Sequence, residues 1–387
     1  MKFSKYIVAA MVAPLLAACS DDDLGPSIFP DVSDEPDSSS YTYKFDKWLN
    51  ANFRDVYNVD FKYLMEDVEA DMDYNLVPAT YENARDLALL TKYLWYDSYD
   101  ELTGKDFIKS YGPRILHLVG SPAYNPNTGT ETLGLAEGGL KVTLFKVNSM
   151  DLSDINMLNE YYFRTMHHEF GHILHQTKSY PTDFNLLSTG RYDDGSWQSK
   201  QPGYVASLGF VTPYASSQAR EDFAETIANY LTRTQDQMDL ILWMAKQGWT
   251  TGSDKDEADV EDDADYFCYY YYEDPSNVET IKYFLTSRER SYGIYRMGLV
   301  GIGGEYLTTV EEVEAYLDKV RETREIYPVE DKDKVDGYDV ILNKQNIARN
   351  WFTDQWKISF DDLRTIVQRR QSDFDIETLR KEVESIQ

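Results

Sequence analysis

The chain has 387 residues, and its 67 Asp+Glu outnumber its 38 Lys+Arg to give a net charge of −29 at pH 7. Because 42% of the residues are hydrophobic, a chain of this length can bury a substantial core, which excludes wholesale disorder. The acidity argues against nucleic-acid partners, since phosphate contacts require clustered Lys and Arg. Two cysteines are too few for a disulfide framework or a cysteine-rich zinc module.

The N-terminus resembles a lipoprotein export signal. Lys2 and Lys5 precede an apolar run that is too short for a transmembrane helix and that ends in Leu16-Ala17-Ala18-Cys19. This ending resembles the lipobox of bacterial lipoproteins and implies that Cys19 is acylated as the first mature residue. The alternative is an ordinary buried cysteine in an N-terminal helix.

The residues after Cys19 indicate where the protein resides. The acidic run Ser20-Asp21-Asp22-Asp23 resembles the surface-export signal of Bacteroidetes-type lipoproteins, which implies an outer-membrane lipoprotein exposed at the cell surface. Asp, Ser and Pro dominate up to residue 40, and a segment with so little to bury is expected to be an extended tether. We therefore expect a signal peptide at 1–18, an acidic flexible tether at 19–40 and a folded domain at 41–387.

Hydrophobic periodicity predicts the elements of this domain. In chain order it predicts helices at 45–57 and from the cap Thr80 to about residue 95, strands at 115–119 and 140–147, helices at 154–176, 221–231, 237–247 and 309–325, and two or three further helices toward the C-terminus. Residues 181–219 are predicted to form a long polar connection, which is uncommon unless the loop is functional. The result is an α+β fold, mostly helical, with a small sheet before the central helix and a C-terminal helical bundle.

Residues 249–275 are acidic and irregular. They contain the run Tyr266-Phe267-Cys268-Tyr269-Tyr270-Tyr271-Tyr272. Such a run favours a strand or loop that packs aromatic faces on the domain. The alternative is a tyrosine platform for substrate, because Tyr combines an apolar body with a polar tip.

Four of the five histidines lie between residues 167 and 175. They include the string His168-Glu169-Phe170-Gly171-His172, and a helix places His168 and His172 one turn apart on one face. This H-E-x-x-H spacing allows two imidazoles to bind one zinc ion, with Glu169 beside them to take a proton from the metal-bound water. The alternative, a helix whose histidines merely fill a polar face, would not predict the acidic pair found downstream.

A catalytic zinc needs a third protein ligand and one open position for water. His175 shares the helical face, but it lies about 10 Å along the axis from His168, so the three histidines cannot easily converge on one ion. The metzincin pattern fails as well, because Lys178 stands where its third His is required. The pair Glu221 and Glu225, four residues apart, could supply the ligand and a carboxylate that orients a ligating histidine, unless it forms only a solvated acidic helix start.

Together, the H-E-F-G-H string and Glu221-Asp222-Phe223-Ala224-Glu225 resemble the zinc domain of anthrax lethal factor and other gluzincin-type peptidases. That resemblance implies Glu221 as the third zinc ligand. A Tyr stands seven residues before this ligand in the toxin, which implies that Tyr214 assists catalysis. The resemblance covers only the two zinc helices, and the Gly that follows the toxin's Tyr is absent here.

A longer segment, residues 162–182, contains His167-His168-Glu169 and Ile173-Leu174-His175-Gln176. It resembles the substrate-import-associated zinc metallohydrolase lipoproteins, which are encoded beside outer-membrane nutrient importers. This second resemblance spans nearly the whole mature chain and leaves residues 249–335 as an enlarged Tyr-rich insertion. It implies a zincin-like domain with one zinc ion per chain, a peptide or glycoprotein substrate, and an association with a nutrient-importer complex.

These features predict a surface-anchored zinc metallopeptidase. Zinc on the two histidines and Glu221 would activate water, Glu169 would act as general base, and Tyr214 would donate a hydrogen bond to the developing oxyanion. The strand at 140–147 could bind an extended peptide by strand addition. Two alternatives stay open: a non-catalytic binding subunit of an outer-membrane importer, and a zinc hydrolase of a non-peptide amide or ester.

Overall fold

A computed structural model of the chain describes residues 35–65, 76–125, 130–132, 134–137, 141–200, 202–246 and 335–387, together with short stretches between 266 and 315. The chain consists of two units, Met1–Tyr43 and Lys44–Gln387, and the second unit contains the sheets and nearly all of the helices described here. The predicted signal peptide, most of the tether and most of the helix at 309–325 lie outside the described residues.

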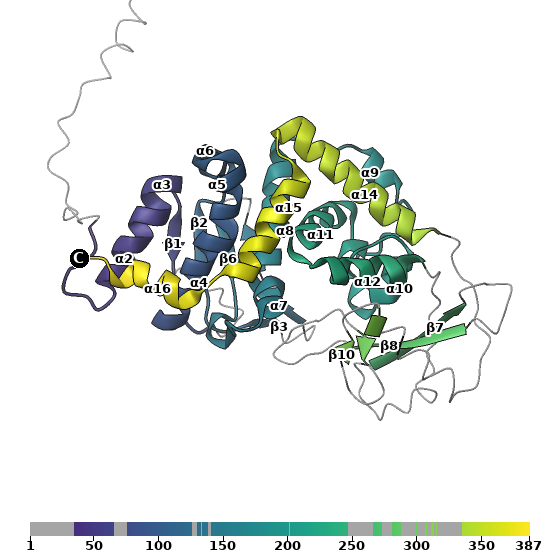
Figure 1. Ribbon diagram of the computed structural model, residues 1–387, viewed down its shortest axis with the longest axis horizontal. Coiled ribbons are helices and arrows are strands. Elements are labelled where there is room, and N and C mark those ends of the chain that lie inside the picture. The colour runs from purple at the N-terminus through teal and green to yellow at the C-terminus, as the bar shows by residue number, and fades with distance from the viewer. Residues whose placement is uncertain are drawn as a thin grey trace, which may run out of the picture. The chain divides into compact units, whose positions relative to one another are not determined.

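The elements follow one another as labelled in Figure 1. The helices and helical turns are α2 (Tyr43–Leu49), η2 (Asn50–Arg54), α3 (Asp55–Tyr57), α4 (Tyr81–Leu90), η4 (Thr91–Tyr96), α5 (Asp97–Thr103), α6 (Lys105–Tyr111), η5 (Val147–Ser149), α7 (Ile155–Leu158), η6 (Asn159–Phe163), α8 (Arg164–Thr177), α9 (Asp183–Leu186), η7 (Trp197–Ser199), α10 (Pro202–Ser207), η8 (Tyr214–Ser216), α11 (Ala219–Thr232), α12 (Gln235–Lys246), α14 (Gly337–Trp351), η12 (Phe352–Trp356), α15 (Phe360–Asp373) and α16 (Ile376–Glu384). The strands are β1 (Asp60–Lys62), β2 (Ile115–Leu118), β3 (Ala123–Asn125), β4 (Thr130–Thr132), β5 (Gly134–Glu137), β6 (Lys141–Leu144), β7 (Tyr266–Tyr272), β8 (Ile281–Ser287), β9 (Leu299–Val300) and β10 (Tyr306–Leu307). This content confirms the prediction of a mostly helical α+β fold.

A four-stranded sheet precedes the central helix in the sequence, and its strand order is β1-β2-β6-β5. Strands β1, β2 and β6 run parallel, whereas β5 pairs antiparallel with β6. In the register, Leu116 lies opposite Val142, which lies opposite Ala136 on its other side. Leu116, Val142 and Leu144 are buried, as expected for parallel strands that are covered on their faces by helices.

The strand predicted at 140–147 is shorter and more central than expected. It spans Lys141–Leu144, and Lys146 then takes a left-handed conformation (φ 67°) that ends the strand before η5. Because β2 lies on one side of β6 and β5 on the other, β6 has no free edge. The expectation that β6 binds a peptide by strand addition is therefore wrong, since strand addition needs unpaired backbone groups. In the described part of this sheet, β5 forms that edge.

The helix predicted after Thr80 is confirmed. Thr80 Oγ1 accepts a hydrogen bond from the backbone N–H of Asn83 (3.4 Å), and the helix continues through α4 into η4. The predicted inward stripe is buried throughout. It consists of Ala84, Leu87, Ala88, Thr91, Leu94 and Trp95.

The central helix begins where the helical periodicity was predicted to start, and the structure shows Asp154 as its cap, because the Asp154 carboxylate accepts hydrogen bonds from two backbone N–H groups. It runs through α7, η6 and α8 to Thr177. One face of α8 packs on η4 and α5, where the ring of Phe170 lies 5.1 Å from the rings of both Trp95 and Tyr99. Another face packs on α11, beside it in Figure 1. Contacts on both faces hold the helix that carries the histidines.

The connection predicted at 181–219 contains more structure than expected. The short helices α9 and α10 and the turns η7 and η8 lie within it. It also contributes Phe184, Val205 and Phe210 to the interior. Elements of one or two turns are too short to produce a visible hydrophobic period, so the sequence pattern did not indicate them.

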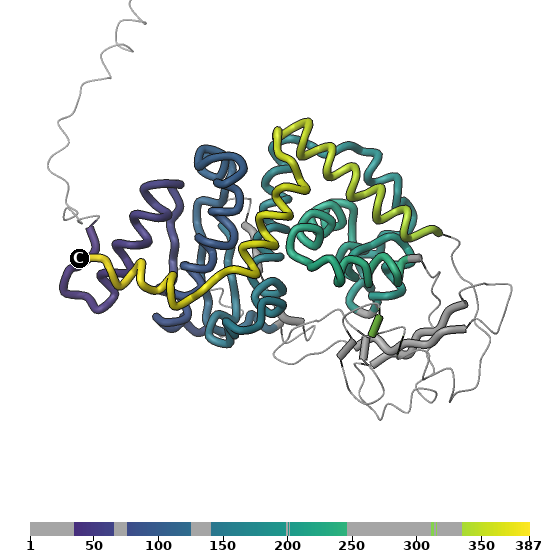
Figure 2. Tube along the Cα trace, in the orientation of Figure 1, coloured from purple at the N-terminus to yellow at the C-terminus, as the bar shows by residue number. Residues whose placement is uncertain are grey.

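The C-terminal helices form, but they pack on earlier helices instead of making a separate bundle. Helix α14 packs on α10, α11 and α12, α15 packs on α5 and α11, and α16 packs on α4. Figure 2 shows the yellow C-terminal trace returning to the purple N-terminal helix. There Lys44 Nζ donates a hydrogen bond to the Glu384 carbonyl oxygen at 2.8 Å. Each helix covers a different part of the core, an arrangement that local periodicity does not encode.

The Tyr-rich run forms a strand, which is compatible with both of its interpretations. It is β7, which pairs antiparallel with β8 over the full length of both strands. A second sheet of order β10-β9-β8-β7 results. The side chains of this run lie outside the described residues, so packing on the domain and a tyrosine platform both stay hypotheses.

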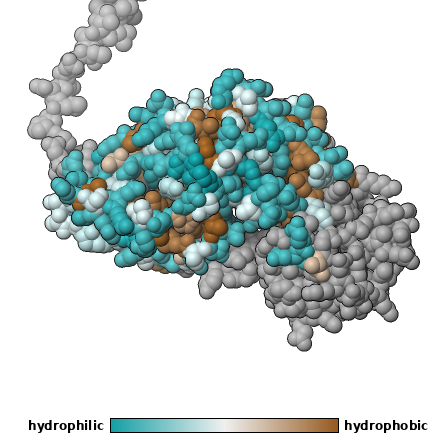
Figure 3. Space-filling model, in the orientation of Figure 1, coloured by the Kyte–Doolittle hydropathy of each residue, from teal (hydrophilic) through white to brown (hydrophobic). Residues whose placement is uncertain are grey.

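The face drawn in Figure 3 is mainly hydrophilic, and its hydrophobic residues form separate small groups. This agrees with the excess of acidic residues in the sequence. Among the helices of the described segments, none has the length and apolar character that a membrane span requires.

Candidate metal centre

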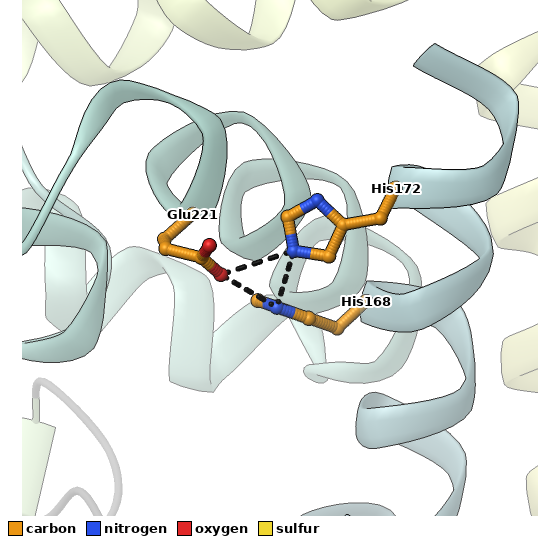
Figure 4. A group of neighbouring side chains, drawn as sticks. All are labelled: His168, His172 and Glu221. Carbon is orange, nitrogen blue, oxygen red and sulfur yellow. Dashed lines mark hydrogen bonds and ion pairs between the residues drawn. The ribbon is translucent and has the colours of Figure 1, made fainter. Parts of the chain in front are cut away.

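Two helices bring three potential ligand atoms together. Helix α8 carries His168 and His172, α11 carries Glu221, and Figure 4 shows the three side chains pointing toward one another. Glu221 Oε2 lies 3.1 Å from His168 Nε2 and 3.0 Å from His172 Nε2, and the two Nε2 atoms are 3.0 Å apart. These residues therefore form a group that could hold a metal ion.

The donor set fits zinc. Two imidazole nitrogens and one carboxylate oxygen are common ligands of catalytic zinc, which keeps its fourth position for water or substrate. With bonds of about 2.0–2.1 Å in a tetrahedral arrangement, neighbouring ligand atoms lie about 3.3 Å apart. The observed separations of 3.0–3.1 Å are only slightly shorter, so the three side chains need to move little to accept the ion.

Small residues at the contact between α8 and α11 allow this convergence. A Cβ atom placed on Gly171 would lie 3.5 Å from Ala224 Cα and 3.6 Å from the Ile227 side chain, so the two backbones approach closely. A large side chain at position 171 would push α11 outward. Glu221 would then move away from both histidines.

Glu225 lies one turn after Glu221 on α11 and contacts the Nδ1 atom of His168, whereas Glu221 faces the Nε2 atom of the same ring. His168 Nδ1 donates a hydrogen bond to Glu225 Oε1 at 2.8 Å. The second carboxylate oxygen accepts from Thr212 Oγ1 at 2.6 Å and from Asn229 Nδ2 at 3.1 Å. Because Glu225 is buried and held at both oxygens, it fixes the ring of His168 in the tautomer that leaves Nε2 free to bind a metal.

The charges of this group depend on one another. Burial alone would lower the pKa of His168, but hydrogen bonds to Glu221 and Glu225 outweigh burial and raise it to about 10. Burial alone would raise the pKa of Glu221, but its hydrogen bonds to the two histidines lower it. A proton on His168 thus balances the carboxylates when no metal is bound, and metal binding must displace that proton.

Glu169 and Tyr214 lie beside the three potential ligands. Glu169 is half-buried, and burial raises the pKa of its carboxyl, which makes it a stronger base. The ring of Tyr214, in the turn η8, lies 5.8 Å from the ring of His168 and is 37% exposed. Burial and the nearby Glu221 carboxylate raise the pKa of Tyr214, so its hydroxyl stays protonated and can donate a hydrogen bond.

Thr212 joins two parts of the site, although no sequence pattern indicated it. Its hydroxyl donates to Glu225 and also accepts a hydrogen bond from the Ala215 backbone N–H at 3.1 Å, which fixes the turn that carries Tyr214. The ring of Trp197 packs against Tyr214 at 4.8 Å. A single Thr ahead of a turn carries no sequence signal, so this role appears only in the structure.

The other two histidines of α8, His167 and His175, contact different partners. His167 Nδ1 lies 2.9 Å from the Tyr99 hydroxyl, and burial lowers the pKa of His167 to about 3. His175 lies outside the group of three convergent ligands, but its Nε2 atom is 2.9 Å from His172 Nδ1. The first contact anchors α8 in the core, whereas the second lies directly behind a potential metal ligand.

A buried ion pair holds α11 to the C-terminal part of the chain. Lys344 Nζ on α14 lies 2.6 Å from Asp222 Oδ2, and both side chains are almost fully buried. Tyr192 donates to the same oxygen at 2.8 Å, and Lys344 donates to the Gly209 carbonyl oxygen at 2.7 Å. Because Asp222 follows Glu221 directly, these contacts fix the start of the helix that supplies the carboxylate ligand.

The fold and the site define a class of protein: an α+β protein with a candidate metal centre, whose possible ligands, two histidines and one glutamate, come from two packed helices. The profile of a family described as "Putative zinc-binding metallo-peptidase" matches residues 38–361, so the chain belongs to this family. This membership agrees with the coarser part of the expectation from the sequence, a zinc-binding metallo-peptidase family.

A solved structure is similar over almost the whole chain. It is described as the crystal structure of a "putative zinc-binding metallo-peptidase" from Bacteroides caccae, with 31% sequence identity and a TM-score of 0.57. The similarity covers 90% of this chain and 98% of that one. A search of curated proteins found no match.

Proposed function

We propose that this protein is a gluzincin-type metallopeptidase that uses zinc and water to hydrolyse peptide bonds. The observation that carries the proposal is the convergence of ligand atoms of His168, His172 and Glu221 within 3.0–3.1 Å of one another. Glu169 follows His168 in the sequence and interacts electrostatically with this group. Membership of a zinc-binding metallo-peptidase family supports the same reaction class.

Zinc in such a site lowers the pKa of water that it binds and polarises the scissile carbonyl. Glu169 accepts the proton of the attacking water and then passes it to the leaving amine. Its raised pKa suits this role, because a base works best when its pKa approaches the working pH. Glu225 keeps the ring of His168 in place during these steps through the 2.8 Å hydrogen bond.

Tyr214 donates a hydrogen bond to the oxygen that becomes negatively charged as water adds to the carbonyl. Its protonated hydroxyl and its position beside His168 support this role. The turn that carries it is fixed by the Ala215 N–H hydrogen bond to Thr212. A donor that is already oriented costs little reorganisation when the charge develops.

Strand β5 is the best candidate for binding the peptide backbone. It is an edge strand of the main sheet in the described residues, and it packs near the zinc helix α8. An extended peptide can hydrogen-bond to such an edge by strand addition. The peptide would therefore bind to β5, the strand next to β6, whereas the sequence predicted binding to the strand at 140–147, which is β6.

Two observations favour an enzyme over a non-catalytic binding subunit of an importer. The described residues supply three convergent ligands, which leaves one tetrahedral position open, whereas structural zinc sites are usually closed by a fourth protein ligand. Glu169, whose carboxyl interacts electrostatically with His168 and His172, can also act as a general base and is not itself one of the three ligands. Hydrolysis of a non-peptide amide or ester would use the same groups, so the substrate must be tested directly.

Metal analysis followed by peptide cleavage tests the proposal. The purified protein is expected to hold about one zinc per chain, because two His and one Glu complete a catalytic ligand set. It should cleave members of a peptide library, lose this activity with a chelator and regain it with zinc. A protein that stays metal-free after dialysis against zinc would contradict the proposal. Zinc binding with cleavage of amides or esters but not peptides would favour the alternative substrate class.

We further propose that the protein is an outer-membrane lipoprotein, exposed at the cell surface and associated with a nutrient importer, where it acts on peptides or glycoproteins. The lipobox-like sequence before Cys19 and the acidic residues after it support this location. Changing Cys19 to Ala is therefore expected to release the protein from membranes, because the polar tether provides no other anchor. Fractionation of cells into soluble and outer-membrane material measures the effect.

The second cysteine provides the matched control. Cys268→Ala leaves the lipobox intact, so this variant should remain with the membrane. If Cys19→Ala sediments with the outer membrane as the unchanged protein does, lipid attachment at Cys19 is not the anchor.

A further inference from the structure

We infer that His175 is a positioning residue for the metal ligand His172, with its Nε2 atom accepting the hydrogen bond that His172 Nδ1–H donates. The two nitrogens are 2.9 Å apart. His175 lies three residues after His172 on α8, and residues at this spacing are neighbours on a helix surface. The inference rests on the proposed zinc site, but it concerns a residue outside the three ligands.

The direction of this hydrogen bond follows from the geometry of His172. Its Nε2 atom faces Glu221 Oε2 at 3.0 Å and His168 Nε2 at 3.0 Å, so this nitrogen must carry a free lone pair to bind a metal. The ring proton of the neutral imidazole is then on Nδ1. His175 Nε2 must be the acceptor, which places the proton of His175 on its own Nδ1 atom.

Aromatic contacts hold the His175 ring in this orientation. Tyr180 meets it nearly edge-on at a ring distance of 5.4 Å, and Phe223 does so at 6.2 Å. The rings of Tyr180 and Phe223 stack on each other at 4.1 Å, and the His175 residue is only 7% exposed. Phe223 lies on α11 between Glu221 and Glu225. The helix that supplies the carboxylate ligand therefore also orients the residue behind His172.

The two ligating histidines thus have different partners. A carboxylate, Glu225, accepts from His168, whereas a neutral imidazole accepts from His172. The site already contains the carboxylates of Glu169, Glu221 and Glu225, and a fourth would be repelled by them in this buried environment. An imidazole fixes the ring of His172 and its tautomer without adding negative charge.

Zinc affinity, measured by competition with a chelator at one fixed pH, tests the inference. His175→Phe keeps a ring of similar size among Tyr180 and Phe223 but removes the acceptor, and it should weaken zinc binding about 10–100-fold. At saturating zinc this variant should still contain the metal, since His175 is not a ligand. His175→Gln can place an acceptor oxygen near the same point, so it should recover most of the affinity.

His167→Phe is the matched control. His167 is also a buried histidine on α8, and its hydrogen bond goes to Tyr99, away from the metal group. This variant should bind zinc with unchanged affinity. Should His175→Phe fail to fold, His175→Leu, which also lacks the acceptor, replaces it, and circular dichroism of the metal-free variants verifies that each is folded.

The outcomes separate the inference from the proposed function. Failure of the unchanged protein to bind zinc would overturn the proposed function. Tight binding by the unchanged protein and equally tight binding by His175→Phe would overturn the inference alone. Equal weakening by His175→Phe and His175→Gln would also overturn it, because the effect would then come from packing and not from the acceptor.

Discussion

Replacing Glu169 with Gln is expected to lower kcat for peptide hydrolysis by about 10²–10⁴-fold while the protein keeps its zinc. Gln has nearly the same shape as Glu, so the helix and its packing should be preserved. The three convergent ligand atoms belong to His168, His172 and Glu221, so the metal does not depend on residue 169. What the variant loses is the group that accepts the proton of the attacking water. Steady-state kinetics together with metal analysis of the same sample measure both effects.

A second substitution at this position distinguishes loss of the base from general damage. Glu169→Asp retains a carboxylate with a shorter reach, so its kcat should lie between those of the unchanged protein and Glu169→Gln. Near-normal activity in Glu169→Gln would show that another group acts as the base. Loss of zinc from this variant would show that Glu169 contacts the metal and that the assignment of the ligands is wrong.

Replacing Glu221 with Gln is expected to weaken zinc binding by about 100-fold or more, beyond the roughly 10–100-fold typical for losing the partner of a ligand. The carboxylate of Glu221 supplies both a ligand atom and a negative charge. The amide oxygen of Gln is a weaker ligand atom and carries no negative charge. Glu221 Oε2 is also the atom that both histidine nitrogens face, at 3.0 and 3.1 Å. Chelator competition measures the affinity, and activity should fall with zinc occupancy.

Substitutions at two other positions on α11 serve as comparisons for the zinc affinity of Glu221→Gln. Glu225→Gln alters the partner of His168 but not a ligand, so the loss should be about 10–100-fold and recoverable at high zinc. Arg220→Gln changes an exposed neighbour of Glu221 and should leave zinc affinity unchanged. If Glu221→Gln keeps normal affinity while His175→Phe loses the metal entirely, the third ligand lies on α8 and the gluzincin-type assignment is wrong.

The sequence by itself determined the features that depend on neighbours along the chain. The predicted cap Thr80 accepts a backbone hydrogen bond where the helical periodicity begins. The spacing of His168 and His172 places them on one helical face because four residues make about one turn. The α+β class followed as well, since strand and helix periods differ and both were visible before α8.

Only the tertiary structure decided which distant segments meet. Glu221 is 53 residues from His168, and its contact with both histidines depends on how α8 packs on α11 at Gly171 and Ala224. Strand β5, which forms an edge of the described sheet, lacks a strong strand pattern in the sequence. The C-terminal helices each pack on a different surface of the core. Periodicity shows that a helix has an apolar face but not which partner covers it. The sequence did not reveal the contact of His175 with His172 either. The spacing of the histidines along the helix argues against His175 as a third ligand. It does not show the orientation of the His175 ring, which depends on packing against Tyr180 and Phe223.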